Sequence, residues 1–497
     1  MTRFLTILLL IMAGCASATA TEFWIAQNAT GNGSGADTND CMALGWPSAN
    51  PGDTVHLVGT FTNYLTVGSS GSAGNPITIL FEPNAKFSAP VINGAIVLYE
   101  KDYITIDGGS NGLIESTDNG SSLGNQTNSV GIGATSCSYL TVKNLTIRNL
   151  YVRTSNSDDK SGNGAGGWAI IDSTTTGSGH ITEFTVSNCV MSDCYVGINA
   201  DYGNNCSNYI FVANTMYRCN WGGKCSDNGS GAVMHNLVVQ GNHIYDFTNW
   251  NDTVSDNYHH NGFYEWAKSG GTCDGVTYNG NLIGPDFGGP YCTSGMWADG
   301  VTTNILMCNN VIICNTNEAP ANAMLQGEPG RYFNNTFIGG GTGQAITTGD
   351  SAVTNGINTW VMGNLTVSAA AFMNNYGINC SYVLIDSNLV YNLPPGAQYS
   401  FGGGGSSWFR TFSEAQAIGF ELHSLDENPL VNLDGTLQAG SPAIGAGPNF
   451  TSLGITNDFA GNPRPATGPW TIGAYQSGTN APAPPTGHPG GFWPGLY

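Results

Sequence analysis

The densest group of proton-exchanging side chains in this chain lies between residues 246 and 265. The stretch DFTNWNDTVSDNYHHNGFYE holds four of the 34 acidic residues and two of the eight histidines. Carboxylates beside a sugar linkage can act as acid, base or nucleophile, and a histidine can give or take a proton near neutral pH. Aspartates can also bind calcium, which would neutralise a uronate and acidify its α-proton for β-elimination. The predicted catalytic residues are Asp252, Asp256, His259, His260 and Glu265.

Aromatic and charged residues in and after this stretch extend the predicted site. Tyr and Trp rings offer flat apolar surfaces on which a sugar ring can stack. Among the basic residues, Lys224, Lys268 and Arg331 are the candidate bases of an elimination. The alternative is that Asp256 and His259 only hydrogen-bond their own loop. The predicted substrate-binding residues are Trp250, Tyr258, Tyr264, Trp266, Trp297, Asp299 and Arg331. Calcium is the one cofactor that these residue types suggest.

The composition restricts the partners. Only 9% of the 497 residues are charged, and acids outnumber bases 34 to 13, which gives a formal net charge of −21. Nucleic acid is therefore excluded as a partner, because phosphate contacts need clustered Lys and Arg. An anionic glycan would also be repelled unless a bound cation reversed the local field. With 40% hydrophobic and 10% aromatic residues, the chain has enough apolar side chains for a large ordered core.

The first twenty residues have the pattern of an export signal. Arg3 precedes an apolar run from Leu5 to Met12, which is too short to span a membrane. Ala18-Thr19-Ala20 is a small-residue cleavage site, so the mature chain is expected to begin at Thr21 and to be secreted. Alternatively, Cys15 is lipidated and anchors the chain at the cell surface. Removing Cys15 leaves 12 of the 13 cysteines, which are expected either to form disulfides or to remain buried free thiols.

One pattern recurs from about residue 100 to 392: a short β-rich run, an Asn, one further residue, and then usually an apolar one. It reads YLTVKNLT, FTVSNCV, FVANTM, VVQGNHI, TYNGNLI, LMCNNVI, YFNNTF, VMGNLT and LIDSNLV. Six of the eight intervals between the Asn residues are 24 to 29 residues long, which is one coil of a β-solenoid. The longer intervals, 44 and 39 residues, indicate extruded loops, and the second contains the acidic and histidine cluster. The Asn positions are 144, 188, 214, 242, 281, 310, 335, 364 and 388.

The repeat predicts how the coils stack. Each Asn is expected at a sharp corner, because Asn tolerates the left-handed backbone that such a corner needs. Stacked Asn amides can hydrogen-bond from coil to coil. The residue two positions after each Asn should face inward; Val190, Met216 and Ile244 fit, whereas Thr146 and Thr366 are exceptions. At the strand spacing of about 4.8 Å, roughly ten coils form a rod about 50 Å long.

With these motifs the chain resembles the right-handed parallel β-helix proteins of secreted bacterial origin, which include many polysaccharide lyases and glycoside hydrolases. The N-terminal segments FWIAQNATGNGSG, PGDTVHLVGTFT and GNPITILFEPNAKFSAP resemble that group, as do GSPAIGAG, NDFAGNPRP and TIGAYQ near the end. The similarity spans about residues 22 to 476. It implies an all-β fold, and it implies that a segment such as Tyr258–Gly262 faces a glycan groove. The paired-Asp and Gly-His-Gly signature of polygalacturonases is missing.

The expected organisation has five parts. Residues 1–20 are the signal peptide, 21–98 an N-terminal cap with the first coils, and 99–395 the repeats. Residues 396–476 are the last coils and a closing segment, and 477–497 a Pro/Gly-rich linker with an aromatic tail.

Two functions remain open. The first is a polysaccharide lyase or glycoside hydrolase acting on extracellular polysaccharide. The second is a non-enzymatic surface, adhesive or filament-forming rod, which would self-associate through its coil ends or its tail.

Overall fold

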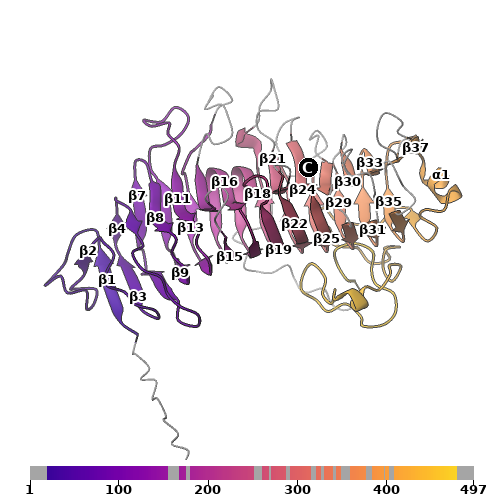
Figure 1. Cartoon of the computed structure of the whole chain (residues 1–497). Helices are drawn as coiled ribbons and strands as arrows, with labels where there is room; N and C mark the ends of the chain where they lie inside the picture. The colour runs from indigo at the N-terminus through magenta and orange to yellow at the C-terminus, as the bar shows by residue number, and fades with distance from the viewer. Residues whose placement is uncertain are drawn as a thin grey trace, which may run out of the picture.

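The computed structural model describes residues 20–154, 167–174, 180–250, 260–267, 270–286, 292–314, 321–325, 330–339, 343–348, 359–375, 383–396, 398–401 and 408–477. They form a right-handed parallel β-helix, as expected from the repeat (Figure 1). The strands make one sheet of 14 strands and one of 24, and each long strand pairs with its equivalent one coil away. Among the described strands only β36 (Tyr399–Phe401) and β37 (Trp408–Arg410) pair in antiparallel fashion. The family resemblance is therefore confirmed for the fold.

The rod has three faces, because the 24-stranded sheet bends around a corner. The strands β16 (Val190–Tyr202) and β18 (Thr215–Asp227) run through this corner. The first residues of β16 pair with β13 (Thr146–Arg148) and its later residues with β14 (Trp168–Ser173). We call the 14-stranded sheet the first face, the early part of the bent sheet the second face, and the later part the third face.

The strands of each face follow the chain order. The first face contains β2 (Met42–Ala43), β1 (Glu22–Ala26), β3 (Thr54–Val58), β6 (Ile77–Phe81), β9 (Ile104–Asp107), β12 (Leu140–Lys143), β15 (Thr182–Ser187), β17 (Cys206–Val212), β19 (Val233–Gln240), β22 (Thr272–Asn279), β25 (Thr302–Cys308), β28 (Gly330–Phe333), β31 (Thr359–Met362) and β34 (Val383–Asp386). The second contains β4 (Thr60–Phe61), β7 (Lys86–Ala89), β10 (Leu113–Ser116), β13 (Thr146–Arg148), the starts of β16 and β18, β20 (His243–Tyr245), β23 (Leu282–Ile283), β26 (Val311–Ile313), β29 (Thr336–Ile338), β32 (Leu365–Val367), β35 (Leu389–Tyr391) and β38 (Leu425–Asp426). The third contains β5 (Leu65–Thr66), β8 (Asn93–Tyr99), β11 (Val130–Thr135), β14 (Trp168–Ser173), the ends of β16 and β18, β21 (His260–Ala267), β24 (Cys292–Gly300), β27 (Ala321–Leu325), β30 (Gln344–Thr348), β33 (Ala371–Asn375), β36 (Tyr399–Phe401) and β37 (Trp408–Arg410). The described helical turns are η1 (Thr248–Trp250), α1 (Phe412–Ala417) and η3 (Thr451–Leu453).

The number of coils exceeds the expectation. The first face has 14 strands in the described residues, so the prediction of roughly ten coils is not confirmed. The Asn repeat underestimates the number because the N-terminal coils, with β1, β3 and β6, stack in the same sheet without the Asn pattern.

The predicted asparagine ladder is present at the corner between the first and second faces. From Asn214 to Asn364, each side-chain amide donates to the Oδ1 atom of the Asn one coil further on, at 2.9 to 3.2 Å, and the ladder ends at Asn388. The same Oδ1 atom also accepts from the backbone N–H of the preceding ladder residue. Each of these buried amides is thus held by its neighbours, as the stacking argument required.

Two details of the corner differ from the prediction. The left-handed residue is the one before each ladder Asn: Ala213, Gly241, Gly280 and Asn309 have φ of 54° to 62°. Asn144 and Asn188 occupy that preceding column, so the ladder position in their coils is Leu145 and Cys189. The inward column in these two coils is accordingly Ile147 and Met191, which stack on Met216. Thr146 therefore ceases to be an exception, whereas Thr366 remains one and is fully buried.

Cysteine side chains fill the core as free thiols. The ten cysteines whose side chains are described are all buried and unbonded, so no disulfide is found among them. Cys194 and Cys219 stack on adjacent coils as their spacing predicted, but their Sγ atoms are 3.3 Å apart and not covalently linked. Within the described residues the cysteines therefore follow the alternative expectation, that of small apolar core residues.

The C-terminal segment folds back along the outside of the rod (Figure 1). Phe450, Ile455 and Trp470 pack on Cys308 and Phe333 of the first face. The buried Arg464 donates to the Asn309 side chain at 2.8 Å and to the carbonyls of Gly473 and Ala474 at 3.0 Å each. In this way residues 155 positions apart in the sequence are fixed together. No helix in the described part of the chain has the length and apolar character needed to cross a membrane.

Candidate functional site

The outer surface of the third face, where β16, β18, β21 and β24 lie side by side, carries the candidate site. Residues of a strand alternate between the core and the outside. Phe263 of β21 faces the core, where its ring lies near those of Phe211 and Tyr278 from the first face. Tyr264 and Trp266, which occupy the alternate positions of the strand, therefore face outward.

In-register pairing aligns the outward residues in two columns along the rod. The first column is Asn199, Lys224, Tyr264 and Trp297, and the second is Asp201, Ser226, Trp266 and Asp299. Four residues predicted from the sequence, Tyr264, Trp266, Trp297 and Asp299, are thus brought together on two adjacent strands.

Tyr264 is the centre of an aromatic cluster. Its ring centroid lies 4.8 Å from Trp297, 5.3 Å from Trp266 and 5.7 Å from Trp221. These rings leave Tyr264 only 4% exposed, whereas Trp266 and Trp297 are half-buried. The outermost accessible rings of the cluster are therefore Trp266 and Trp297.

Lys224 and Asp201 form an ion pair beside the aromatic cluster. The Lys224 Nζ atom lies 4.0 Å from Asp201 Oδ1 and 5.6 Å from the centroid of the Trp221 ring. Asp201 also accepts hydrogen bonds from Ser226 Oγ at 2.6 Å and from Asn199 Nδ2 at 3.3 Å. Both side chains of the pair are 26% exposed, so each is held in place and yet reaches solvent. Such a pair can exchange a proton with a bound molecule.

Sequence reasoning missed Asp201 and did not place Lys224 beside it. The usable signal was the 25-residue offset between Cys194 and Cys219. Continued along the same strands, this offset pairs Asn199 with Lys224 and Asp201 with Ser226. The polar residues of the face could therefore have been aligned from the sequence once one coil length was fixed.

Glu265 and Trp250, both predicted for the site, are buried elsewhere. Glu265 faces the interior of the rod, where Tyr202 Oη donates to it at 3.2 Å and Thr302 Oγ1 at 2.5 Å. Burial raises the pKa of its carboxyl to about 8, although these hydrogen bonds act in the opposite direction. Trp250 is 1% exposed and packs on Tyr195. Glu265 is thus placed to hold three parts of the core together and not to meet a substrate.

The other predicted residues are not brought to this face by the described structure. Arg331 lies on β28 of the first face, where its guanidinium lies over the Trp360 ring. Asp252, Asp256, Tyr258, His259 and Lys268 lie outside the described residues. His260 begins β21, and its side chain is also outside what is described.

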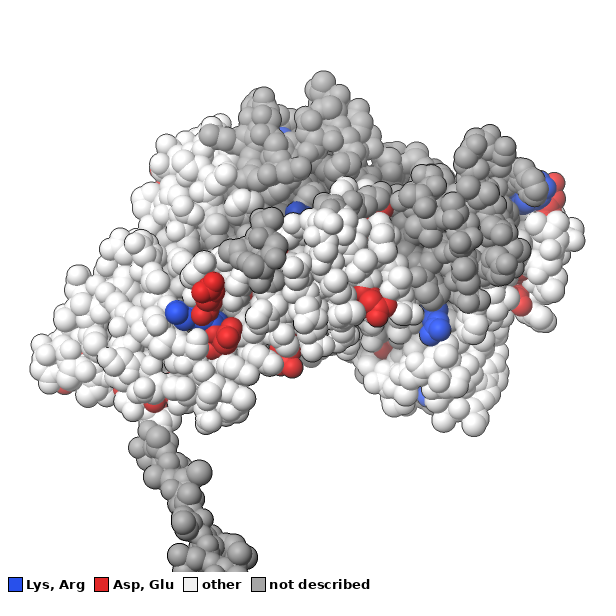
Figure 2. All heavy atoms as spheres, in the orientation of Figure 1, with Lys and Arg blue, Asp and Glu red and all other residues white. Residues whose placement is uncertain are grey.

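Charge is sparse on the rod, as Figure 2 shows for one side of the molecule. On the third face, Lys224 is accompanied by Asp201, which reaches solvent, and by Asp299, which is fully buried. Within the described ranges, no three His, Cys, Asp or Glu side chains gather as metal ligands would. The calcium hypothesis therefore has no ligand set in that part of the chain.

No family model and no curated protein sequence matches this chain. Solved structures match it at low similarity. A GH136 lacto-N-biosidase from Eubacterium ramulus has a TM-score of 0.47 and 13% identity over 75% of this chain and 64% of that chain, so this chain spans less than two thirds of its length. The pectate lyase Pel9A has a TM-score of 0.45 and 15% identity over 93% and 97% of the two chains. The PL6 family alginate lyase AlyGC has a TM-score of 0.36 and 11% identity over 75% and 54%. At these values no residue role passes from those proteins to this chain.

Proposed function

We propose that the third face binds a polysaccharide chain and that Lys224 and Asp201 carry the proton transfer that cleaves it. The observation that supports this most is the combination of two half-buried tryptophans, Trp266 and Trp297, with a half-buried Lys–Asp pair on one face. Aromatic faces bind the apolar sides of sugar rings, and the ion pair supplies an acid–base group beside them.

The direction of the bound chain follows from the stacking. Outward residues repeat at the spacing between strands, about 4.8 Å, along the rod axis. Successive sugar rings of an extended polysaccharide would lie over successive coils. Such a chain would meet Lys224, Trp266 and Trp297 in turn, because these residues lie on three consecutive coils.

Elimination is the cleavage that the described residues favour. Hydrolysis requires two carboxyl groups about 5 to 9.5 Å apart. Asp201 and Asp299 share a column but are three coils apart, which is roughly 14 Å at the strand spacing. β-Elimination instead requires one base for the α-proton, neutralisation of the uronate carboxylate, and departure of the glycosidic oxygen from the β-carbon. We propose Lys224 as the base: its neutral amine, held by Asp201, takes the α-proton while the glycosidic oxygen leaves the β-carbon with a proton from solvent. A calcium ion that neutralised the uronate would need ligands from outside the described residues.

The experiment compares variants on a panel of neutral and uronate polysaccharides, each with added calcium or with a chelator. Reducing ends report any cleavage, and the ultraviolet absorbance of an unsaturated product reports elimination. Lys224→Met is expected to lower the rate about 10²- to 10⁴-fold. Lys143→Met is the matched control, because Lys143 forms a comparable pair with Asp107 on the first face at 3.1 Å. Trp297→Ala is expected to weaken polysaccharide binding.

The outcome separates the alternatives. Equal losses in the Lys224 and Lys143 variants would contradict the proposed site. Reducing ends without absorbance would replace elimination by hydrolysis. Folded protein that neither binds nor cleaves any polysaccharide of the panel would refute the proposal and favour the structural rod, which sedimentation would then show as concentration-dependent polymers.

We also infer that the chain is exported and cut before Thr21. The Thr21 backbone nitrogen lies 2.7 Å from Oδ1 of Asp53, a carboxylate only 4% exposed, whose Oδ2 atom accepts from the Asn50 N–H. Cleavage after Ala20 would turn this nitrogen into an ammonium group, so Asp53 would gain a charged partner. Intact mass and N-terminal sequencing of protein recovered outside the producing cell test the inference. A first residue other than Thr21, or lipid on Cys15, would refute it.

A further inference from the structure

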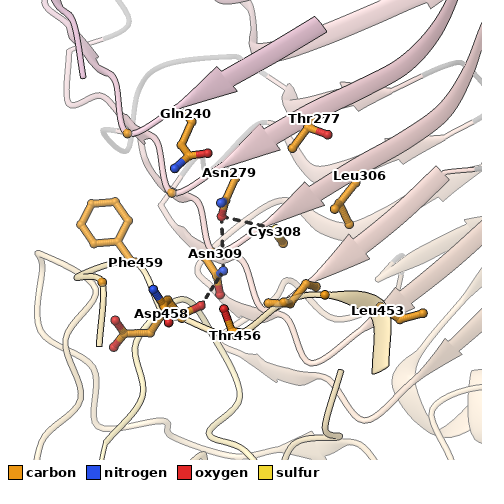
Figure 3. Close-up of a pocket in the computed structure, with 16 residues that line it drawn as sticks. Gln240, Thr277, Asn279, Leu306, Cys308, Asn309, Leu453, Thr456, Asp458 and Phe459 are labelled. Atoms are coloured by element: carbon orange, nitrogen blue, oxygen red, sulfur yellow. Dashed lines mark hydrogen bonds between the residues drawn. The ribbon is translucent and has the colours of Figure 1, made fainter. Parts of the chain in front are cut away.

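A pocket lies between the C-terminal segment and the first face (Figure 3). Its volume is about 380 Å³, which is within the range of small-molecule sites. The floor consists of the ends of β19, β22 and β25, with Gln240, Thr277, Asn279 and Leu306. The wall is the C-terminal stretch 453–461, with Thr456, Asp458 and Phe459. Figure 3 shows the amides of Gln240, Asn279 and Asn309 in a row, with Phe459 and Asp458 on the side of the C-terminal segment.

Hydrogen bonds fix the wall of the pocket to its floor. Asn309 Nδ2 donates to the Asn457 carbonyl at 3.0 Å, and Arg464 holds the Oδ1 atom of the same Asn309. Asp458 accepts from the backbone N–H groups of Asn462 at 2.7 Å and Gln476 at 2.9 Å. The one carboxylate of the lining is therefore occupied by the fold itself, and the remaining lining groups are uncharged.

The remaining polar groups are available to a ligand. No hydrogen bond between described residues engages the side chains of Gln240, Thr277 or Thr456. Together they offer amide and hydroxyl donors and acceptors, while Leu306 and Phe459 supply apolar surface. An uncharged molecule with several hydroxyl groups and an apolar ring face matches this set.

The glycines of the lining keep the space open. Gly241 and Gly280 occupy the left-handed column before the ladder, with φ of 61° and 62°, and a Cβ at either would meet no atom within 4 Å. In the next coil the same column carries Asn309 with φ of 54°. Asn is therefore compatible with this backbone, and glycine is not needed for the conformation alone. What glycine adds at Gly241 and Gly280 is room.

We propose that this pocket binds a neutral saccharide unit, at a site separate from the third face. It would hold one or two sugar rings without cleaving them, and so would retain the protein on a glycan. This proposal does not depend on the acid–base role of Lys224, since the pocket lies on another face of the rod.

The test measures binding of soluble neutral disaccharides, namely cellobiose, lactose, maltose and xylobiose, to the full chain by titration calorimetry and saturation-transfer NMR. Gly280→Asn should fill the pocket and weaken binding about tenfold or more without unfolding the coil. Ala213→Asn is the matched control, because Ala213 occupies the same column with φ of 55° but does not line the pocket. Gln240→Ala should weaken binding about two- to tenfold through the loss of one amide.

The arms distinguish this proposal from the proposed function. Loss of disaccharide binding in Gly280→Asn with retention in Ala213→Asn and Trp297→Ala would support a separate site. Loss only in Trp297→Ala would place the sugar on the third face and overturn the proposal. The proposal is also overturned if none of the four disaccharides binds, or if Gly280→Asn binds like the wild type. Equal melting temperatures of Gly280→Asn and wild type confirm that the comparison is between folded proteins.

Discussion

Replacing Asn281 by alanine tests whether the asparagine ladder stabilises the rod. The Asn281 side chain is fully buried in the middle of the ladder. Its Oδ1 atom accepts from the backbone N–H and from the amide of Asn242, both at 3.0 Å. Its Nδ2 atom donates to the Val239 carbonyl at 2.8 Å and to Asn310 Oδ1 at 2.9 Å. One substitution thus removes four hydrogen bonds that link three coils.

The expected loss of stability follows from that count. A hydrogen bond contributes roughly 1 kcal/mol net, so four of them amount to about 4 kcal/mol. The partners remain buried after the substitution, so the loss includes the cost of leaving them without this amide. A loss of this size is a large fraction of the stability of a typical domain.

Urea unfolding followed by tryptophan fluorescence and circular dichroism measures the change. Because repeat proteins can unfold in steps, the first transition is compared between variants. The control is Asn236→Gly, which removes a single exposed Asn–Asn bond to Asn208 and keeps a residue suited to the φ of 65°. This control should change stability by less than about 0.5 kcal/mol. A loss below about 1 kcal/mol for Asn281→Ala, or one equal to the control, would refute the view that the ladder is a main source of stability.

Three further predictions concern other parts of the rod. Burial raises the pKa of the Glu265 carboxyl from its unfolded value of 4.5 to about 8, so the folded state binds more protons in this interval and the stability should fall as the pH rises from about 5 to 8. Glu265→Gln should flatten this pH dependence. Unfolding midpoints with the same pH slope in the variant and the wild type would contradict the prediction. Gly222→Ala should destabilise the coil by roughly 2 kcal/mol or more, because the added Cβ would lie 2.4 Å from Ile244 and 2.5 Å from the Gly262 carbonyl oxygen. Gly133→Ala is the control and should be tolerated, because the nearest atom to its added Cβ is 3.5 Å away. Equal midpoints of the two variants in thermal melts would show the reasoning to be wrong. Asp53→Ala should destabilise a chain that begins at Thr21 by about 1 to 3 kcal/mol. Differential scanning calorimetry of mass-verified mature protein measures this loss, and equal unfolding midpoints of variant and wild type would contradict the prediction.

The sequence by itself determined the architecture. Each coil repeats one local pattern, and stacking places equivalent positions above one another, so a period of 24 to 29 residues is sufficient to predict a parallel solenoid. The ladder was predictable for the same reason, since from Asn214 onward the spacing of Asn residues is the spacing of coils. Even so, Asn144 and Asn188 were placed one column away from their true position. A left-handed corner accepts Asn in either column, so residue type alone could not fix the register.

Only the tertiary structure decided which side chains share a surface. Tyr264 and Glu265 are adjacent in the sequence, yet strand alternation sends one to the outer face and the other into the core. Asp201 and Lys224 meet because two coils are in register, and Arg331 is removed to another face because its strand belongs to the first sheet. The pocket beside Gly280 depends on a contact between Asn309 and Arg464, 155 residues apart. No local pattern contains such a contact, because it arises when the closing segment packs on the outside of a rod already formed by the repeats.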